Sequence, residues 1–278
     1  MRMQLFHIGS LWAALAVATP AAAQSFSTSA VSPAALPASG SIAANYPAGA
    51  AETRYYFTAD LKAGVLASQI AYRGAPDATK TLEFTLLNGA GREVGSYYIK
   101  SVGENYEGVR AFRVDNSGTY TIRLSIKGPE TASFKVDLGG SSLAGKIAAP
   151  ASTSGPSTSF INPSPLPADG VIAGTIPPGR GYQTSYYFAA PLKGGQLVSQ
   201  IGVTSTGSAG PNMIEMALLK PDGNPIDTYY TKSFEKNHEA TKTFSIGNTD
   251  TYVVRVTVQG AETTKFKAEL GGSALQAK

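Results

Sequence analysis

An internal repeat is the strongest constraint on how this 278-residue chain can fold. Residues 82–141 align without a gap to residues 214–273, and 24 of these 60 aligned positions are identical. Farther upstream, the Tyr-Tyr-Phe segment at 55–57 recurs at 186–188. A duplication of this length predicts two units of the same structure that follow one another along the chain.

The boundaries of the two units follow from the composition between them. Residues 148–159 consist only of Ala, Ser, Thr, Gly and Pro, a composition that buries little surface and stays extended or flexible. We therefore expect a first domain at 25–145, a linker at 146–159 and a second domain at 160–278. Each domain then has the usual size for a single hydrophobic core.

Within each unit, apolar residues recur at every second position. Leu82, Phe84 and Leu86 alternate with Glu83 and Thr85, and later segments of both units show the same period. Turns rich in Gly, Asn, Asp and Pro separate these runs, and no amphipathic helix pattern stands out. About eight short antiparallel strands per unit bury their alternating faces best as two packed sheets. The sequence therefore predicts an all-β fold of two tandem antiparallel β-sandwiches, jelly-roll or immunoglobulin-like.

Three segments of the first unit also resemble a known family. They are Tyr55-Tyr56-Phe57 leading to Leu61-Lys62-Ala63-Gly64, the strand pattern at 82–87 before a glycine-rich turn, and the pattern at 117–124. Together they resemble the bacterial pre-peptidase C-terminal domain family, and both units carry the pattern. The resemblance implies a β-sandwich that accompanies secreted hydrolases and helps with secretion, localisation, or substrate and matrix binding. No catalytic domain accompanies the two units in this sequence.

Metal and cofactor chemistry is not expected. The chain has no Cys, which removes disulfides, thiolate zinc sites, iron–sulfur clusters and cysteine nucleophiles. The family resemblance implies calcium binding, where it occurs, through aspartates near the strand at 82–87. This chain has Glu83 there and Glu215 in the second unit, without the oxygen-rich loop that calcium requires. We therefore expect no metal site and no cofactor.

The first residues have the pattern of a secretory signal peptide at 1–23. Arg2 precedes a short apolar run at 11–17, and Ala21-Ala22-Ala23 stands before Gln24, as signal-peptide cleavage requires. No Cys follows the cleavage position to carry a lipid, and no later apolar run approaches the roughly 20 residues that span a bilayer. Cleavage leaves a net charge of 22 − 19 = +3, too small to predict nucleic-acid binding. We expect a periplasmic or secreted protein.

Catalytic residues are not expected either. After cleavage, His238 is the only histidine, and it lies in a polar stretch that predicts a solvent-exposed side chain. The acids retained in both units are Glu83 with Glu107 and Glu215 with Glu239, and a glycosidase needs two carboxylates roughly 5–10 Å apart. The same acids equally fit charge ladders on solvated sheets. A glycan-active enzyme that uses these pairs is one alternative function.

Binding residues have better support in the sequence. Neighbours in a strand point to opposite faces, so one tyrosine of each Tyr-Tyr pair reaches the surface, where its ring can stack on a sugar or anchor a protein. The expected outward tyrosines are Tyr56, Tyr98, Tyr187 and Tyr230. Outward amides that suit the hydroxyls of a carbohydrate are Gln69, Gln200, Asn105 and Asn237.

These observations favour a non-catalytic, exported accessory protein that binds an envelope polysaccharide or a protein partner. The repeated tyrosines predict one site in each unit, so that a flexible linker would make the protein bivalent for a polymeric ligand. A second alternative is an assembly or adhesion subunit whose edge strands pair with a partner. The sequence leaves the oligomeric state open.

Overall fold

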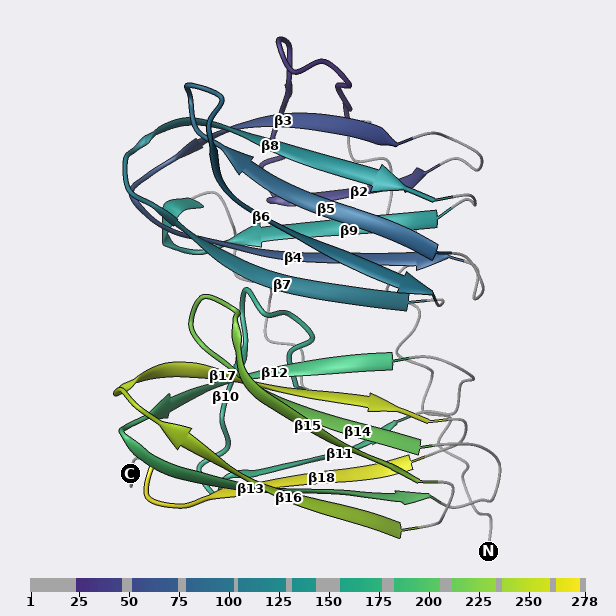
Figure 1. The fold of residues 1–278 in the computed structure, drawn as a ribbon, viewed down its shortest axis with the longest axis vertical. Coiled ribbons are helices and arrows are strands. Elements are labelled where there is room, and N and C mark those ends of the chain that lie inside the picture. The colour runs from purple at the N-terminus through teal and green to yellow at the C-terminus, as the bar shows by residue number, and fades with distance from the viewer. Residues whose placement is uncertain are drawn as a thin grey trace, which may run out of the picture.

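The computed structural model contains two β-sandwiches, one above the other in Figure 1. The structure describes residues 24–46, 52–74, 79–102, 105–128, 132–143, 156–176, 183–205, 212–233, 237–260 and 264–275. Within these ranges the regular structure is strands and one short 3-10 helix, and no helix is long and apolar enough to cross a membrane.

Copy 1 of the repeat forms the upper sandwich in Figure 1. Its five-stranded sheet, called A1, has the order β1-β3-β8-β5-β6, and its four-stranded sheet, called B1, has the order β2-β9-β4-β7. The pairs are antiparallel except for β1 with β3. The elements are β1 (Ala34–Ala35), β2 (Ser41–Tyr46), β3 (Thr53–Leu61), β4 (Gly64–Gly74), β5 (Thr79–Leu87), β6 (Glu93–Val102), β7 (Asn105–Val114), β8 (Gly118–Lys127), β9 (Ala132–Gly139) and the 3-10 helix η2 (Ser141–Leu143).

Copy 2 repeats this topology strand for strand. Its five-stranded sheet, A2, has the order β10-β12-β17-β14-β15, and its four-stranded sheet, B2, has the order β11-β18-β13-β16. The strands are β10 (Ser164–Pro165), β11 (Val171–Ile176), β12 (Gln183–Leu192), β13 (Gly195–Ser205), β14 (Asn212–Leu219), β15 (Pro225–Ser233), β16 (Asn237–Ile246), β17 (Asp250–Gln259) and β18 (Thr264–Gly271). The prediction of two tandem antiparallel β-sandwiches is confirmed.

Each sandwich has its own hydrophobic core between its two sheets. In β5 the side chains of Leu82, Phe84 and Leu86 are almost completely buried, whereas Glu83 points to the outer face of A1. The ring of Phe84 stacks on Phe112 of B1 with centroids 5.4 Å apart, so aromatic contacts join the two sheets. Burial of one such large side chain stabilises the fold by roughly 1.5–3 kcal/mol. The period of two therefore decides which residues form the cores.

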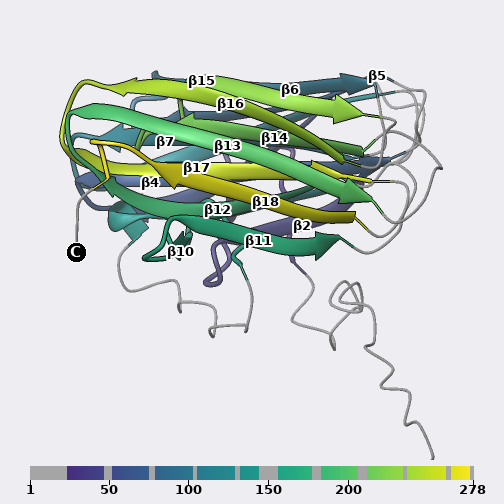
Figure 2. The ribbon, with the colours of Figure 1, turned by 90° about the horizontal axis from the view of Figure 1, so that it is seen from below.

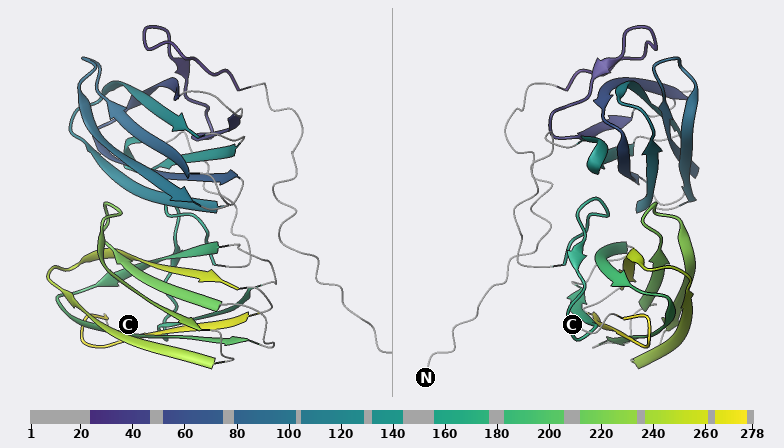
Figure 3. Two further views of the ribbon diagram at one scale, coloured as in Figure 1. Left: turned by 45° about the vertical axis from the view of Figure 1, so that its right-hand side comes forward. Right: turned by 90° about the vertical axis from the view of Figure 1, so that its left-hand side faces the viewer.

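A third apolar cluster joins the two copies. It consists of Ala67 and Ala111 on B1, Tyr187, Ala217, Leu219 and Val253 on A2, and Phe160 in the loop before β10. The outer face of the four-stranded sheet of copy 1 therefore packs on the outer face of the five-stranded sheet of copy 2. Figures 1 and 3 show both sandwiches with the five-stranded sheet above the four-stranded sheet. Seen from below in Figure 2, the strands of the two copies run in similar directions.

The chain between the copies takes part in this contact. The carbonyl oxygen of Ser157 accepts a hydrogen bond from the backbone N–H of Tyr187 at 2.8 Å. The next carbonyl, of Thr158, accepts one from the Nε2 atom of Gln69 at 3.1 Å. These contacts fix Ser157 and Thr158 against both copies, and residues 146–155 of the expected linker lie outside the described residues.

Candidate functional site

Tyr98 and Tyr230 are the two most exposed aromatic side chains in the described part of the chain, with 67% and 64% of their surface accessible. They occupy the same position in the two copies, on the edge strands β6 and β15. Their neighbours Tyr97 and Tyr229 face inward and pack against the cores. The prediction that the second tyrosine of each pair reaches the surface is confirmed for this pair.

Each exposed tyrosine lies opposite a carboxylate that forms an ion pair. Tyr98 faces Glu83 across the β5–β6 ladder, and Tyr230 faces Glu215 across the β14–β15 ladder. In copy 2 the Nη2 atom of Arg255 lies 2.8 Å from Glu215 Oε1, and in copy 1 the Nη2 atom of Arg123 lies 3.4 Å from Glu83 Oε1. We call these groups the tyrosine sites, consisting of Tyr98 with Glu83 and Arg123 in copy 1, and of Tyr230 with Glu215 and Arg255 in copy 2.

The other expected pair of surface tyrosines behaves differently in the two copies. Tyr187 points away from the core of its own sandwich but is 0% exposed, because copy 1 covers it. Its hydroxyl donates a hydrogen bond to Glu107 Oε1 of copy 1 at 2.6 Å, and its ring meets Phe160 edge-on at 6.0 Å. The prediction that Tyr187 is a surface residue is therefore wrong. Tyr56, at the same position in copy 1, remains partly exposed.

The electrostatic setting of Tyr187 follows from this burial. Removal from water, followed by the nearby Glu107 carboxylate, raises the pKa of Tyr187 well above its ordinary value. The phenol therefore stays neutral at neutral pH and donates to Glu107. The group is part of the contact between the copies and is not available to a ligand.

The two outward glutamines also differ. Gln69 is only 8% exposed, because its Nε2 atom donates to Glu107 Oε2 at 3.2 Å and its Oε1 atom accepts the backbone N–H of Phe160 at 3.0 Å. The prediction that Gln69 is available at the surface is wrong, since the segment before β10 covers it. Gln200 is exposed, and its Nε2 atom donates to Glu239 Oε2 at 2.8 Å.

Three polar residues singled out in the sequence lie outside the described side chains. Asn105 and Asn237 begin β7 and β16, and His238 follows Asn237 in β16. Only the backbone of these residues is described. Their proposed contribution to binding stays a prediction.

The structure does not bring the repeated carboxylates together within a copy. Glu83 lies on β5 of sheet A1, whereas Glu107 lies on β7 of sheet B1 and faces the other copy. Glu215 and Glu239 are separated in the same way, on A2 and B2. The outer faces of two packed sheets point in opposite directions, so neither pair can flank one glycosidic bond. Among the described residues, no group of three or more His, Asp and Glu side chains is placed to hold a metal ion.

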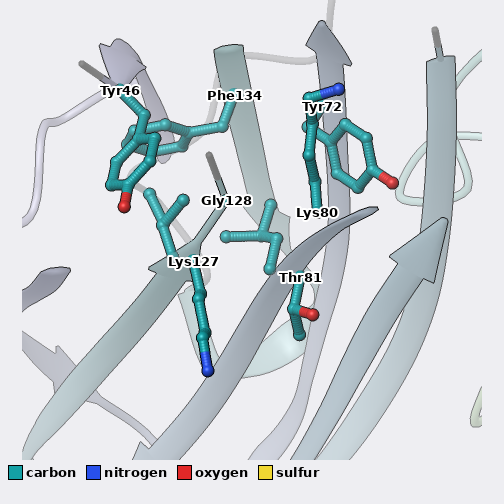
Figure 4. Close-up of a pocket in the computed structure, with 9 residues that line it drawn as sticks. Tyr46, Tyr72, Lys80, Thr81, Lys127, Gly128 and Phe134 are labelled. Atoms are coloured by element: carbon teal, nitrogen blue, oxygen red, sulfur yellow. The ribbon is translucent and has the colours of Figure 1, made fainter. Parts of the chain in front are cut away.

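The described part of copy 1 contains a small cavity and a shallow surface hollow. Figure 4 shows a cavity of about 10 Å³ at one end of the sandwich, lined by Tyr46, Tyr72, Lys80, Phe134 and neighbouring residues. It has room for about one water molecule and is too small for a sugar. A second, shallow and open hollow on the surface is lined by Thr28, Glu52, Thr53, Arg54 and Tyr56.

Comparisons with known proteins add little to this geometry. No protein-family model matches the chain, so the resemblance to the pre-peptidase C-terminal domain family stays a prediction, and no curated protein matches it. Among solved structures, the tandem CBM22-1–CBM22-2 domain of Paenibacillus barcinonensis Xyn10C aligns over 84% of this chain and 91% of its own length, with 11% identity and a TM-score of 0.23. The PBSX exported protein XepA aligns over 84% and 88%, with 10% identity and a TM-score of 0.23. At these scores the likeness carries no argument, so the class of protein, a tandem β-sandwich, rests on the strands of this chain.

Proposed function

We propose that this chain is an exported, non-catalytic accessory protein that binds a polysaccharide of the cell envelope through its two tyrosine sites. The observation that carries the proposal is that Tyr98 and Tyr230 are exposed at the same position in both copies, each opposite an ion-paired glutamate. One exposed aromatic side chain needs no explanation, but the same ring exposed beside the same ion pair in both copies supports a shared role.

The chemistry of these sites suits a sugar polymer. A tyrosine ring offers a flat, rigid apolar face on which the C–H groups of a sugar ring can stack, at little cost in conformational entropy. The neighbouring carboxylate accepts hydrogen bonds from sugar hydroxyls, and the arginine N–H groups donate to them. Both tyrosines lie on edge strands, where a long ligand can run across the sheet without entering a cleft.

The contact between the copies changes how two such sites act together. Because the sandwiches pack through a buried interface, Tyr98 and Tyr230 keep a fixed spacing and do not sample the range that a flexible linker would allow. A fixed spacing favours polymers whose repeat matches it, since the second contact costs little further ordering. Export is part of the same proposal and is supported by the signal-peptide pattern at 1–23, which lies outside the described residues.

Retention on immobilised envelope polysaccharides tests the proposal. Tyr98→Ala and Tyr230→Ala should each weaken binding at their site by about 1–2 kcal/mol, roughly 5–30-fold, and the double variant should lose retention. The matched control is the pair Tyr98→Phe and Tyr230→Phe, which keeps both rings and should keep most of the retention.

Circular dichroism and thermal melting of each variant separate a binding loss from unfolding. Equal retention of the full chain and the double alanine variant would refute a role for the tyrosine sites. Absence of retention on every envelope polysaccharide, together with co-purification of a protein partner, would leave a protein as the ligand.

A further inference from the structure

The contact between the two copies joins a four-stranded sheet to a five-stranded sheet. One sheet of each kind therefore has a free outer face, and these two faces lie at opposite ends of the molecule. Within the chain, the four-stranded sheet B1 packs on the five-stranded sheet A2. Copy 1 also has a five-stranded sheet, A1, and copy 2 also has a four-stranded sheet, B2. Figure 3 shows that neither of these two sheets has the other sandwich on its outer face, and that they lie at opposite ends of the stack.

The hydrogen-bonding groups of the internal contact form a defined set. Glu107 on B1 receives the hydroxyl of Tyr187 at 2.6 Å on one oxygen and the side-chain amide of Gln69 at 3.2 Å on the other. Tyr187 comes from A2, so one residue of the five-stranded face and two residues of the four-stranded face make up the set. The bonds orient the two sheets as well as holding them together.

All three members of this set recur on the free faces. Tyr56 occupies the position of Tyr187 on A1, whereas Gln200 and Glu239 occupy the positions of Gln69 and Glu107 on B2. Gln200 already donates to Glu239 at 2.8 Å, as its counterpart does in the internal contact. The acceptor on B2 and the donor on A1 are therefore in place for the same hydrogen bond.

The turns beside these faces recur as well. In the β14–β15 turn, the carbonyl of Asp222 accepts the N–H of Ala111 from edge strand β7 at 2.7 Å, and Gly223, at φ +80°, lies against Arg110. The β5–β6 turn has the same backbone hydrogen bonds, with Gly91 at φ +74° and open space around it. The β5–β6 turn of copy 1 thus has the shape of the β14–β15 turn, but among the described residues no edge strand contacts it at Gly91.

The loop before each sandwich shows the same relation. Ser157 Oγ donates to the carbonyl of Asn162 at 2.7 Å, and Ser27 Oγ donates to the carbonyl of Ser32 at 2.6 Å, so the two loops have the same shape. Ile161 in the second loop packs against the cluster between the copies. Val31, its counterpart in the first loop, is 96% exposed. An apolar side chain is therefore exposed where its counterpart is used for contact.

The free faces differ from the internal contact in the size and polarity of their side chains, and Phe160 of the internal contact corresponds to Ala30. Four apolar residues of the internal contact correspond to threonines on the free faces, namely Val109, Ala111, Ala217 and Val253, which correspond to Thr241, Thr243, Thr85 and Thr121. Threonine has nearly the shape of the valine at two of these positions and is larger than the alanine at the other two. The free faces therefore fit less closely and gain less from leaving water. A contact between chains also lacks the high effective concentration that the covalent connection gives the internal one. Both differences make it the weaker of the two.

We propose that the chain associates head to tail with further copies of itself, with sheet B2 of one chain packed on sheet A1 of the next in the arrangement of the internal contact. In such a contact each chain uses A1 toward one neighbour and B2 toward the other. The chains therefore form open rows unless the rotation from one chain to the next closes a ring. Tyr230 stays exposed although A2 is covered, and Tyr98 at the matching position of A1 is expected to stay exposed in the row.

Sedimentation velocity of the full chain up to millimolar concentration tests this inference. The weight-average mass should rise with concentration through a series of multiples of the monomer. Tyr56→Glu blocks A1, because its carboxylate would meet Glu239 of the next chain, and Thr243→Glu places a charge at the B2 position equivalent to the buried Ala111, so each variant alone should stay monomeric. A mixture of the two retains one good A1 face and one good B2 face, and should form dimers at about twice the monomer mass and nothing larger.

The controls keep the test decisive. Asn116→Glu adds the same charge in an exposed turn away from both faces and should associate like the unchanged chain. Val31→Glu and Val198→Glu, both at exposed positions, form a second pair if either member of the first fails to fold. A chain that stays monomeric at millimolar concentration, single variants that associate normally, or a mixture that stays monomeric would each overturn the inference. Polysaccharide retention by the same variants separates this result from the proposed function.

Discussion

The buried hydrogen bond between Tyr187 and Glu107 allows a sharp test of the contact between the copies. Tyr187→Phe keeps the ring in place and removes only the hydroxyl, which leaves Glu107 Oε1 without its donor at 2.6 Å. A hydrogen bond to a charged group contributes about 1.5–3 kcal/mol, so we expect the free energy of unfolding to fall by about 2 kcal/mol. Tyr56→Phe is the matched control. The hydroxyl of Tyr56 is on a partly exposed side chain, so its removal leaves no buried group unpaired and should lower the free energy of unfolding by less than about 0.5 kcal/mol.

Urea unfolding of the two variants and the unchanged chain, followed by circular dichroism at micromolar concentration, measures this difference. A double-mutant cycle with Glu107→Gln should give a coupling energy of about 1 kcal/mol or more, because the two residues share one hydrogen bond across the interface. Equal costs for Tyr187→Phe and Tyr56→Phe, or a coupling energy near zero, would refute the packing of B1 on A2.

Two further predictions follow from the same contact. Because the pKa of Tyr187 is raised in the folded protein, its contribution to stability is complete below the ordinary tyrosine pKa of about 10 and is lost as the pH rises through the folded-state pKa. In urea unfolding at increasing pH above about 10, Tyr187→Phe should therefore lose less stability than the unchanged chain. An equal loss in both proteins would contradict this. Residues 25–145 and 160–278, expressed separately, should each melt cooperatively, with the second half binding more of a hydrophobic dye because it exposes Tyr187, Phe160 and Leu219; an unfolded half would show that the two sandwiches depend on each other.

Local sequence predicted the facing of side chains toward each core but not the contact between the copies. Alternation placed Phe84 inside and Tyr98 outside, and both are where the period of two puts them. The same rule treats Tyr56 and Tyr187 alike. Burial of Tyr187 depends on the outer face of B1, where its partner Glu107 is 80 residues away along the chain. The rule is local, so it cannot report which outer face meets another.

A signal for that contact is nevertheless present in the differences between the copies. At outward positions of A2 the chain has Ala217 and Val253 where A1 has Thr85 and Thr121. An outward residue that is apolar in one copy and polar in the other indicates a face that is permanently covered, within the chain, in one copy only. The alternative in which the repeated carboxylates lie close together was wrong for a different reason. Strand order places Glu83 and Glu107 on separate sheets, and no spacing in the sequence encodes strand order.

The duplication also connects the tyrosine sites with the stacking of the sandwiches. Tyr98 and Tyr230 lie on edge strands, and the contact that covers A2 leaves Tyr230 with 64% of its surface accessible. One step of stacking therefore carries one tyrosine site to the next along the same side of the molecule. If the free faces repeat that step between chains, the spacing of sites within a chain and between chains is nearly the same. A polymer that fits the two sites of one chain would then fit a row of chains, and each additional weak contact would add to the total affinity.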